Sequence, residues 1–217
     1  MSIAIIDCGS GNLRSAAKAF EKVATTNTGP VYVTKCPDRV LKADHIVLPG
    51  VGSFPDFKKG LNSLPGLTEA LEEQVIHRGR PFLGICVGMQ LMADIGYEHS
   101  PTKGLGWLAG SVLKIERSRQ LDDENLLKIP HMGWNTLSVN LPGHPFFNGI
   151  KNGVHLYFIH SFHLKLEKQE NLIATTDYGG ALTAIAGRDN IIGTQFHPEK
   201  SQGLGLKMIQ NFLAWRP

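Results

Sequence analysis

The feature that most constrains the fold is an alternation of short apolar runs with helix-like stretches over the first hundred residues. The runs are rich in β-branched residues and several end in glycine clusters, which is typical of buried strands followed by turns. Strands that alternate with single helices favour a mostly parallel sheet flanked by helices. We therefore predict an α/β fold with strands at 3–6, 31–34, 45–48 and 81–85, and with helices at about 12–23, from the capping Ser63 to Gly79, and from Cys86 through Met92.

The second half of the chain is richer in strands. A last helix at about 204–215 is expected to bury Leu206, Ile209, Phe212 and Leu213, and the charged segment 117–128 is expected to be a surface loop. Because no Pro/Ser-rich linker divides the halves, we predict one domain over residues 1–217, in which the mostly parallel sheet gains additional antiparallel strands. The candidate strands are 110–116, 136–139, 156–160, 172–176, 182–186 and 191–195.

Composition excludes several functional classes. The chain is 42% hydrophobic over 217 residues, which is enough for a buried core without disulfides or metals. Its net charge is +3 without a run of basic residues, so nothing favours nucleic-acid or membrane-surface binding. No apolar stretch of membrane-spanning length and no secretory signal are found. Three cysteines without CxxC spacing argue against a disulfide framework or a zinc site and favour the cytoplasm.

The most informative window is Gly84-Ile85-Cys86-Val87-Gly88, which lies between an apolar strand and an apolar helix. Glycines two residues on either side of a nucleophile suit a sharp strand-to-helix turn whose strained backbone projects the side chain. A helix N-terminus also favours the thiolate, and the amide of Val87 is well placed to donate to an oxyanion. The window predicts a nucleophilic Cys86; the alternative is a buried structural cysteine in a glycine-rich turn.

A thiol nucleophile needs a base, and His197 directly follows the predicted strand 191–195. If the strands are parallel, a histidine at this strand end faces the same rim as the Cys86 turn. Glu199 lies two residues on, across a proline that stiffens the link, so its carboxylate can fix the imidazole tautomer. Alone, the pattern is more typical of a surface histidine beside an unrelated glutamate. Together with the Cys86 turn it predicts a base and its orienting carboxylate.

Three further segments are less specific. The turn at 48–52 could direct its amides at an oxyanion or a phosphate, although a plain turn is the alternative because the lysine of a P-loop is absent. His160 and His163 form an HxxH pair, but without further carboxylates we expect no metal site. The segment Pro-His-Met-Gly-Trp-Asn at 130–135 looks like a loop that enters a strand, and it could be core or a partner surface.

Taken together, these motifs resemble a known family. The ordered set PGVG, GICVGMQ and QFHPE resembles the class I, or triad, glutamine amidotransferases. Within that class, the chain resembles the glutaminase subunits of imidazole glycerol phosphate synthases nearly end to end. PHMGWN and HPEKS are far more selective than the motifs of the whole class. The segments that carry the closer resemblance are IDCGSGN at 6–12, PHMGWN at 130–135, YFIHSF at 157–162 and QFHPEKS at 195–201.

The resemblance implies a reaction and roles for particular residues. Cys86 would attack the side-chain amide of glutamine to give a γ-glutamyl thioester, with His197 as the base and Glu199 orienting it. Gly52 and Val87 match the oxyanion hole, for which the PGVG peptide is expected to flip. No cofactor and no metal are implied. The positions implied to hold glutamine are Gly50, Gly52, Gln90, Glu98, Ser161 and Phe162.

The resemblance also implies a partner. Ammonia would pass through a channel to a (β/α)₈-barrel cyclase subunit in a heterodimer, which would make imidazole glycerol phosphate and aminoimidazole carboxamide ribotide in histidine biosynthesis. Two departures from the family pattern leave the triad untouched: Cys8 replaces an aromatic residue beside the docking turn, and Phe162 replaces a tyrosine. The implied partner-facing residues are Asn12, His131, Met132, Trp134 and Lys200.

Three other functions remain open at this level. A sibling amidotransferase would use the same triad and feed ammonia to a sugar-modifying partner. A stand-alone cysteine hydrolase would act without a partner, but it gives no reason for Gln90, Glu98 and the 130–135 segment together. A non-enzymatic scaffold subunit of the same fold would be favoured by loss of a triad residue, and all three are present.

Overall fold

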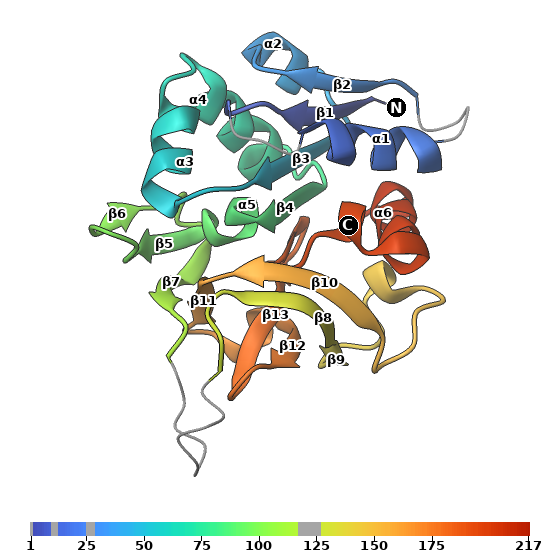
Figure 1. Ribbon diagram of the computed structural model, residues 1–217. Coiled ribbons are helices and arrows are strands. Elements are labelled where there is room, and N and C mark those ends of the chain that lie inside the picture. The colour runs from blue at the N-terminus through green and yellow to red at the C-terminus, as the bar shows by residue number, and fades with distance from the viewer. Residues whose placement is uncertain (1, 10–12, 25–28, 117–126) are drawn as a thin grey trace.

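The computed structural model describes residues 2–9, 13–24, 29–116 and 127–217 (Figure 1). An eight-stranded sheet forms its centre, and its first five strands are parallel, as the alternating pattern predicts. The remaining three strands are antiparallel, which confirms the predicted mixture. In spatial order the strands are β2 (Val31–Thr34), β1 (Ile3–Ile6), β3 (His45–Gly50), β4 (Phe82–Cys86), β14 (Ile191–Thr194), β13 (Ala181–Arg188), β12 (Leu172–Asp177) and β9 (Ser138–Val139).

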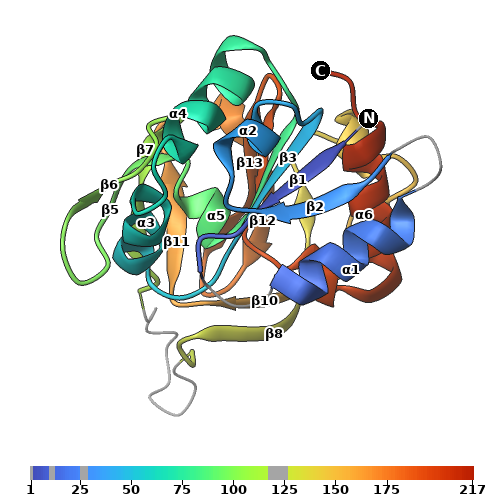
Figure 2. The same ribbon diagram turned by 90° about the horizontal axis from the view of Figure 1, so that it is seen from above.

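Helices cover both faces of the parallel part of the sheet. Helices α1 (Leu13–Val23) and α6 (Gln202–Ala214) lie against one face, and α3 (Phe54–Asn62), α4 (Leu67–Glu72) and the short α5 (Val87–Gln90) lie on the other (Figure 2). A further short helix, α2 (Pro37–Val40), contacts α4. Strands that are buried on both faces read as continuous apolar runs, which is why β1, β3 and β4 could be recognised in the sequence.

The predicted helix from Ser63 to Gly79 is wrong at its start. Ser63 instead follows α3, a helix that the sequence analysis missed, and Ser53 caps the N-terminus of α3 by accepting a hydrogen bond from Asp56. The chain restarts as α4 after Gly66, whose φ of 74° requires glycine, and continues as the π-helical turn Glu73–His77. Leu67, Leu71 and Val75 are buried along this second segment, as the apolar spacing predicts.

Two smaller sheets flank the antiparallel edge of the central sheet. One contains β11 (Phe162–Leu166), β7 (Leu108–Lys114), β5 (Ala93–Gly96) and β6 (Thr102–Lys103), so the chain forms a strand directly after the position where the predicted helix through Met92 ends. The other pairs β10 (His155–His160) with β8 (His131–Thr136), so the expected loop at 130–135 is largely a strand. The predicted strand 136–139 is divided at the buried Leu137, where the chain leaves β8 and enters β9.

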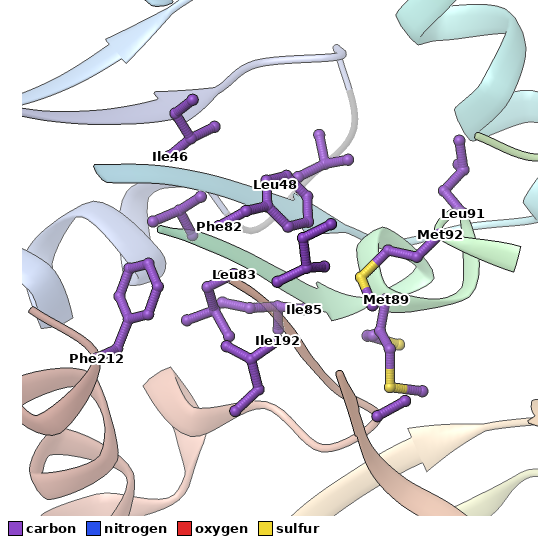
Figure 3. Close-up of a cluster of buried hydrophobic side chains, with 14 of the residues drawn as sticks. Ile46, Leu48, Phe82, Leu83, Ile85, Met89, Leu91, Met92, Ile192 and Phe212 are labelled. Carbon is purple, nitrogen blue, oxygen red and sulfur yellow. The ribbon is translucent and has the colours of Figure 1, made fainter. Parts of the chain in front are cut away.

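The core forms where the parallel strands meet the helices. Apolar side chains from β3, β4, β14 and α6 and from the segment that follows Cys86 gather in one cluster (Figure 3). Each such side chain contributes about 1.5–3 kcal/mol when fully buried. The core therefore holds β4 and β14 rigidly at the edge where the candidate catalytic residues follow.

In the part of the chain that the structure describes, no helix is long and apolar enough to cross a membrane.

Candidate active site

Cys86 sits at a strained corner between β4 and α5. Its φ is 54° and its ψ is −111°, a conformation that non-glycine residues rarely adopt. A Cβ on Gly84 would lie 2.6 Å from the carbonyl oxygen of Gly88, and a Cβ on Gly88 would collide with the backbone of Leu48 in β3. Both glycines are therefore needed for the close approach of the turn, as the sequence predicts. The predicted support from a helix dipole is small, because α5 has only four residues.

The sulfur of Cys86 is buried and makes hydrogen bonds with Ile159 and Gln195. The thiol lies 3.8 Å from the carbonyl oxygen of Ile159 in β10, to which it donates. The side-chain amide nitrogen of Gln195 donates to Sγ over 3.6 Å. Sequence reasoning missed Gln195 as a site residue, although it stands two positions before His197 at the end of a predicted strand, which is the signal that could have identified it.

His197 and Glu199 form a buried pair on the turn that follows β14. His197 Nδ1 lies 2.8 Å from Glu199 Oε1, and both side chains are 2% exposed. The turn itself is the short helix Pro198–Lys200, and it is held where the backbone N–H of His197 donates to Tyr157 in β10. The pair therefore has the geometry in which a carboxylate fixes the imidazole tautomer.

The strands place this pair beside Cys86. Ile85 is in register with Thr194 in the parallel pair β4–β14, so both strands end at one edge, as predicted. Burial lowers the pKa of His197, but the charge of Cys86 and the hydrogen bond to Glu199 raise it to about 10. His197 Nε2 makes no hydrogen bond, so Cys86 acts on the imidazole through its charge. His197 Nε2 is thus placed to receive a thiol proton.

A cavity of about 330 Å³ joins most of the residues that the sequence singles out. Gly50 is not in its lining; it pairs with Cys86 across β3 and β4, where a Cβ would lie 2.7 Å from the amide of Gly88. Gly52 has a φ of 94°, and no atom lies within 4 Å of the position of a Cβ. Glycine is therefore favoured at this position by the backbone conformation and not by a lack of space for a side chain. The predicted residues in the lining are Gly52, Cys86, Val87, Gln90, Glu98, Ser161, Phe162, His197 and Lys200.

The proposed glutamine-binding side chains are partly engaged with the protein. Gln90 donates both hydrogens of its amide nitrogen, to the carbonyl of Phe162 at 2.9 Å and to Oε1 of Gln195 at 3.0 Å. Glu98 accepts from the backbone N–H of Phe54 at 2.7 Å through one carboxylate oxygen. A ligand can therefore meet the side chain of Gln90 only through an acceptor oxygen, which suits the ammonium group of an amino acid.

The predicted partner-facing residues that belong to β8 divide between its two faces. Met132 and Trp134 are 59% and 47% exposed on the outer face. The ring of Trp134 packs edge-on against Tyr157, and Lys200 Nζ lies 5.8 Å from the centre of the Tyr157 ring. His131 is buried on the inner face, so the expectation that it contacts a partner is not supported, because alternate residues of a strand face opposite sides. Asn12 lies outside the described residues.

His131 belongs to a buried hydrogen-bond network instead. Its Nδ1 lies 2.9 Å from Nε2 of His160, whose Nδ1 lies 2.9 Å from the carbonyl oxygen of Phe162. That carbonyl can only accept, so His160 carries its proton on Nδ1 and receives the hydrogen bond of His131. Burial lowers the pKa of both histidines, to about 4 for His131 and about 3 for His160. Among the described residues, no group of three metal-binding side chains occurs.

Comparison with known families agrees with this geometry. The family model described as glutamine amidotransferase class-I matches residues 4–215. The strained cysteine turn, the buried His197–Glu199 pair and this match agree, and the chain belongs to the class I glutamine amidotransferases.

Full-length relatives narrow the family further. The chain is 54% identical to the imidazole glycerol phosphate synthase subunit HisH of Rhodopseudomonas palustris and 53% identical to that of Agrobacterium fabrum, with all of both chains covered in each comparison. It therefore falls within the HisH family of the class I enzymes, as its motifs indicate.

Solved structures agree at the level of the fold. A crystal structure of a glutamine amidotransferase matches with a TM-score of 0.71 at 15% identity, covering 98% of this chain and 99% of the other. A glutamine amidotransferase from Thermotoga maritima matches with a TM-score of 0.60 at 16% identity, covering 92% of this chain and 76% of the other.

Proposed function

We propose that the chain hydrolyses glutamine to glutamate and ammonia with Cys86, His197 and Glu199 as its catalytic triad. The observation that carries the proposal is that a strained cysteine and the histidine of a buried histidine–glutamate pair line the same cavity. A cavity of about 330 Å³ is of the size that small ligands occupy. The acceptor oxygens of Gln90 and Glu98 would bind the ammonium group of the substrate.

The proposed reaction proceeds through proton transfers to and from His197. His197 Nε2 takes the thiol proton, and Sγ of Cys86 attacks the amide carbon of glutamine. The backbone N–H groups of Gly52 and Val87 would bind the resulting oxyanion. His197 then protonates the departing nitrogen, which leaves as ammonia and yields the thioester. Water, deprotonated by His197, cleaves the thioester to glutamate and restores the thiol.

The ammonia would be used by a partner subunit. We propose a heterodimer with a (β/α)₈-barrel cyclase of histidine biosynthesis, because the full-length relatives are subunits of imidazole glycerol phosphate synthase. The exposed Met132, Trp134 and Lys200 support a docking surface beside the cavity. Three free cysteines fit a reducing compartment, so we also propose the cytoplasm as the location.

The test is glutamate release from glutamine, measured for the purified chain alone and with a cognate cyclase subunit plus its ribonucleotide substrate. Low activity alone and strong activity in the complex are expected. Silence of the folded protein in both conditions would overturn the assignment of this partner. The Cys86→Ala variant should lose at least a thousandfold in rate while it still folds and binds the partner, because no nucleophile remains. Retained turnover in that variant would refute the triad.

A further inference from the structure

Gln195 is a buried polar residue that the proposed mechanism does not use. It follows β14 directly, has no exposed surface, and its backbone N–H donates to Ala184 in β13 at 2.9 Å. A glutamine side chain at such a position costs free energy unless its amide is hydrogen-bonded. Both ends of the amide have partners: Gln90 at the oxygen and Cys86 at the nitrogen.

The orientation of this amide is fixed by its neighbours. Gln90 uses its amide nitrogen for the carbonyl of Phe162, which can only accept, so the same nitrogen faces Gln195 and requires an acceptor there. Oε1 of Gln195 is that acceptor, and its Nε2 must then point at the sulfur of Cys86. Reversing the amide of Gln195 would place two N–H donors face to face. The sulfur therefore always faces a donor.

The hydrogen bonds of the sulfur to Ile159 and from Gln195 depend in opposite ways on whether the sulfur carries its proton. The carbonyl of Ile159 accepts a hydrogen bond only while the sulfur carries its proton. The amide of Gln195 donates to the sulfur in either state, and a hydrogen bond to an anion is about twice as strong as one between neutral groups. When the thiol proton moves to His197, the contact with Ile159 is lost and the contact with Gln195 strengthens.

We propose that Gln195 is a further catalytic residue, whose side-chain amide donates to the sulfur of Cys86 and stabilises the attacking thiolate. The inference rests on the proposed function of Cys86. In the step concerned, the S–H bond breaks, the proton goes to Nε2 of His197 and the electron pair stays on sulfur. As the S–C bond forms, the charge moves to the substrate oxygen and the hydrogen bond of Gln195 weakens. Gln195 thus favours formation of the thiolate rather than later steps.

The experiment measures the pH dependence of Cys86 alkylation by iodoacetamide, quantified on the peptide that contains Cys86. Gln195→Met removes the donor at similar size, and Gln74→Met is the matched control, because Gln74 is also buried but donates to Leu41 far from the cavity. The ionisable groups around the sulfur stay the same in both variants: His197, Glu199, His160, Glu98 and Lys200.

We expect Gln195→Met to raise the midpoint of the alkylation profile by about one pH unit, a tenfold shift between thiol and thiolate. The midpoint is the decisive readout, because a thiolate of higher pKa is also more nucleophilic and partly restores the rate. Gln74→Met should leave the midpoint unchanged. Alkylation needs neither glutamine nor a partner, so the result is independent of whether the proposed glutaminase activity is observed.

An unchanged midpoint in folded Gln195→Met would overturn the role of Gln195. If that variant does not fold, Gln195→Glu keeps the size of the side chain and replaces the donor with an acceptor. Its carboxylate would oppose the thiolate, so the midpoint should rise by more than one unit. A midpoint equal to that of the unmodified chain in Gln195→Glu would equally refute the proposal.

Discussion

At the scale of single residues, the candidate site depends on the charge that each buried group carries. His197 illustrates this, because its surroundings act in opposite directions. Burial disfavours the imidazolium, whereas Cys86 and Glu199 favour it strongly enough to bring the pKa to about 10. The imidazole can therefore hold the thiol proton until it is transferred to the leaving nitrogen. Replacing one neighbour at a time separates their contributions to the pKa of His197.

We expect the pKa of His197 to fall in Cys86→Ala, because the charge of Cys86 is the largest effect that raises it. NMR titration of the labelled imidazole measures the change, and a fall of more than one unit is expected. Cys36→Ala is the control, since Cys36 is an exposed free cysteine. An unaltered titration in Cys86→Ala would show that Glu199 alone holds the proton on the ring.

At the scale of elements, close backbone contacts position the triad. Helix α6 approaches the turn Pro198–Lys200 so closely that a Cβ on Gly205 would collide with the carbonyl of Pro198. Gly203 lies two residues earlier in the same helix, with no atom near the position of a Cβ. Only one of these glycines is therefore required by packing, and that one contacts the segment between His197 and Glu199.

We expect Gly205→Ala to lower the free energy of unfolding by about 1–3 kcal/mol, because the added methyl displaces the backbone of Pro198. The rate of glutamate release should fall as well, since the His197–Glu199 pair moves with that backbone. Gly203→Ala is the matched control and should stabilise the protein by up to about 1 kcal/mol without loss of activity. Urea denaturation and the glutaminase assay measure both effects; equal behaviour of the two variants would contradict this explanation.

The elements also show what the sequence could reveal. The parallel strands β1, β3 and β4 were predictable, because burial on both faces leaves continuous apolar runs. The turn around Cys86 was predictable because glycine spacing reports a close approach that other residues cannot make. The start of the helix after Ser63 was wrong, because serine and proline also occur where one helix ends and the next begins. The burial of His131 was missed, because the 130–135 segment was not recognised as a strand with alternating faces.

At the scale of the whole molecule, the candidate site lies where three sheets meet. Cys86 and His197 follow strands of the central sheet, Ile159 and His160 come from β10, and Phe162 begins β11. The contacts that orient Gln90 and Gln195 join residues more than seventy positions apart. Sequence reasoning could name the triad from local motifs, and the position of Gln195 two residues before His197 could have marked it as a candidate, but only the packing of these sheets shows that its amide reaches the sulfur.

Packing of the whole molecule also buries several histidines in their neutral form. Burial and the charge of Arg216 lower the pKa of His45 to about 4, and burial lowers the pKa of His131 to about 4 and that of His160 to about 3. The unfolded chain would protonate each of them near pH 6.5. Between pH 6.5 and about 4 these three histidines therefore bind more protons in the unfolded state than in the native state. The stability that they contribute is fully present above pH 6.5 and falls as the pH decreases through this window.

His45 offers the clearest test, because it lies at the start of β3, away from the cavity that contains Cys86. His45→Gln removes one titrating group, so the slope of the free energy of unfolding against pH should decrease by up to about 1.4 kcal/mol per unit between pH 6.5 and 4. Urea denaturation of both proteins at several pH values measures the two slopes. Other ionisable groups are shared, so their effects cancel in the comparison. Parallel curves would show that His45 is protonated in the native state as readily as in the unfolded chain, and that its burial beside Arg216 does not contribute to acid sensitivity.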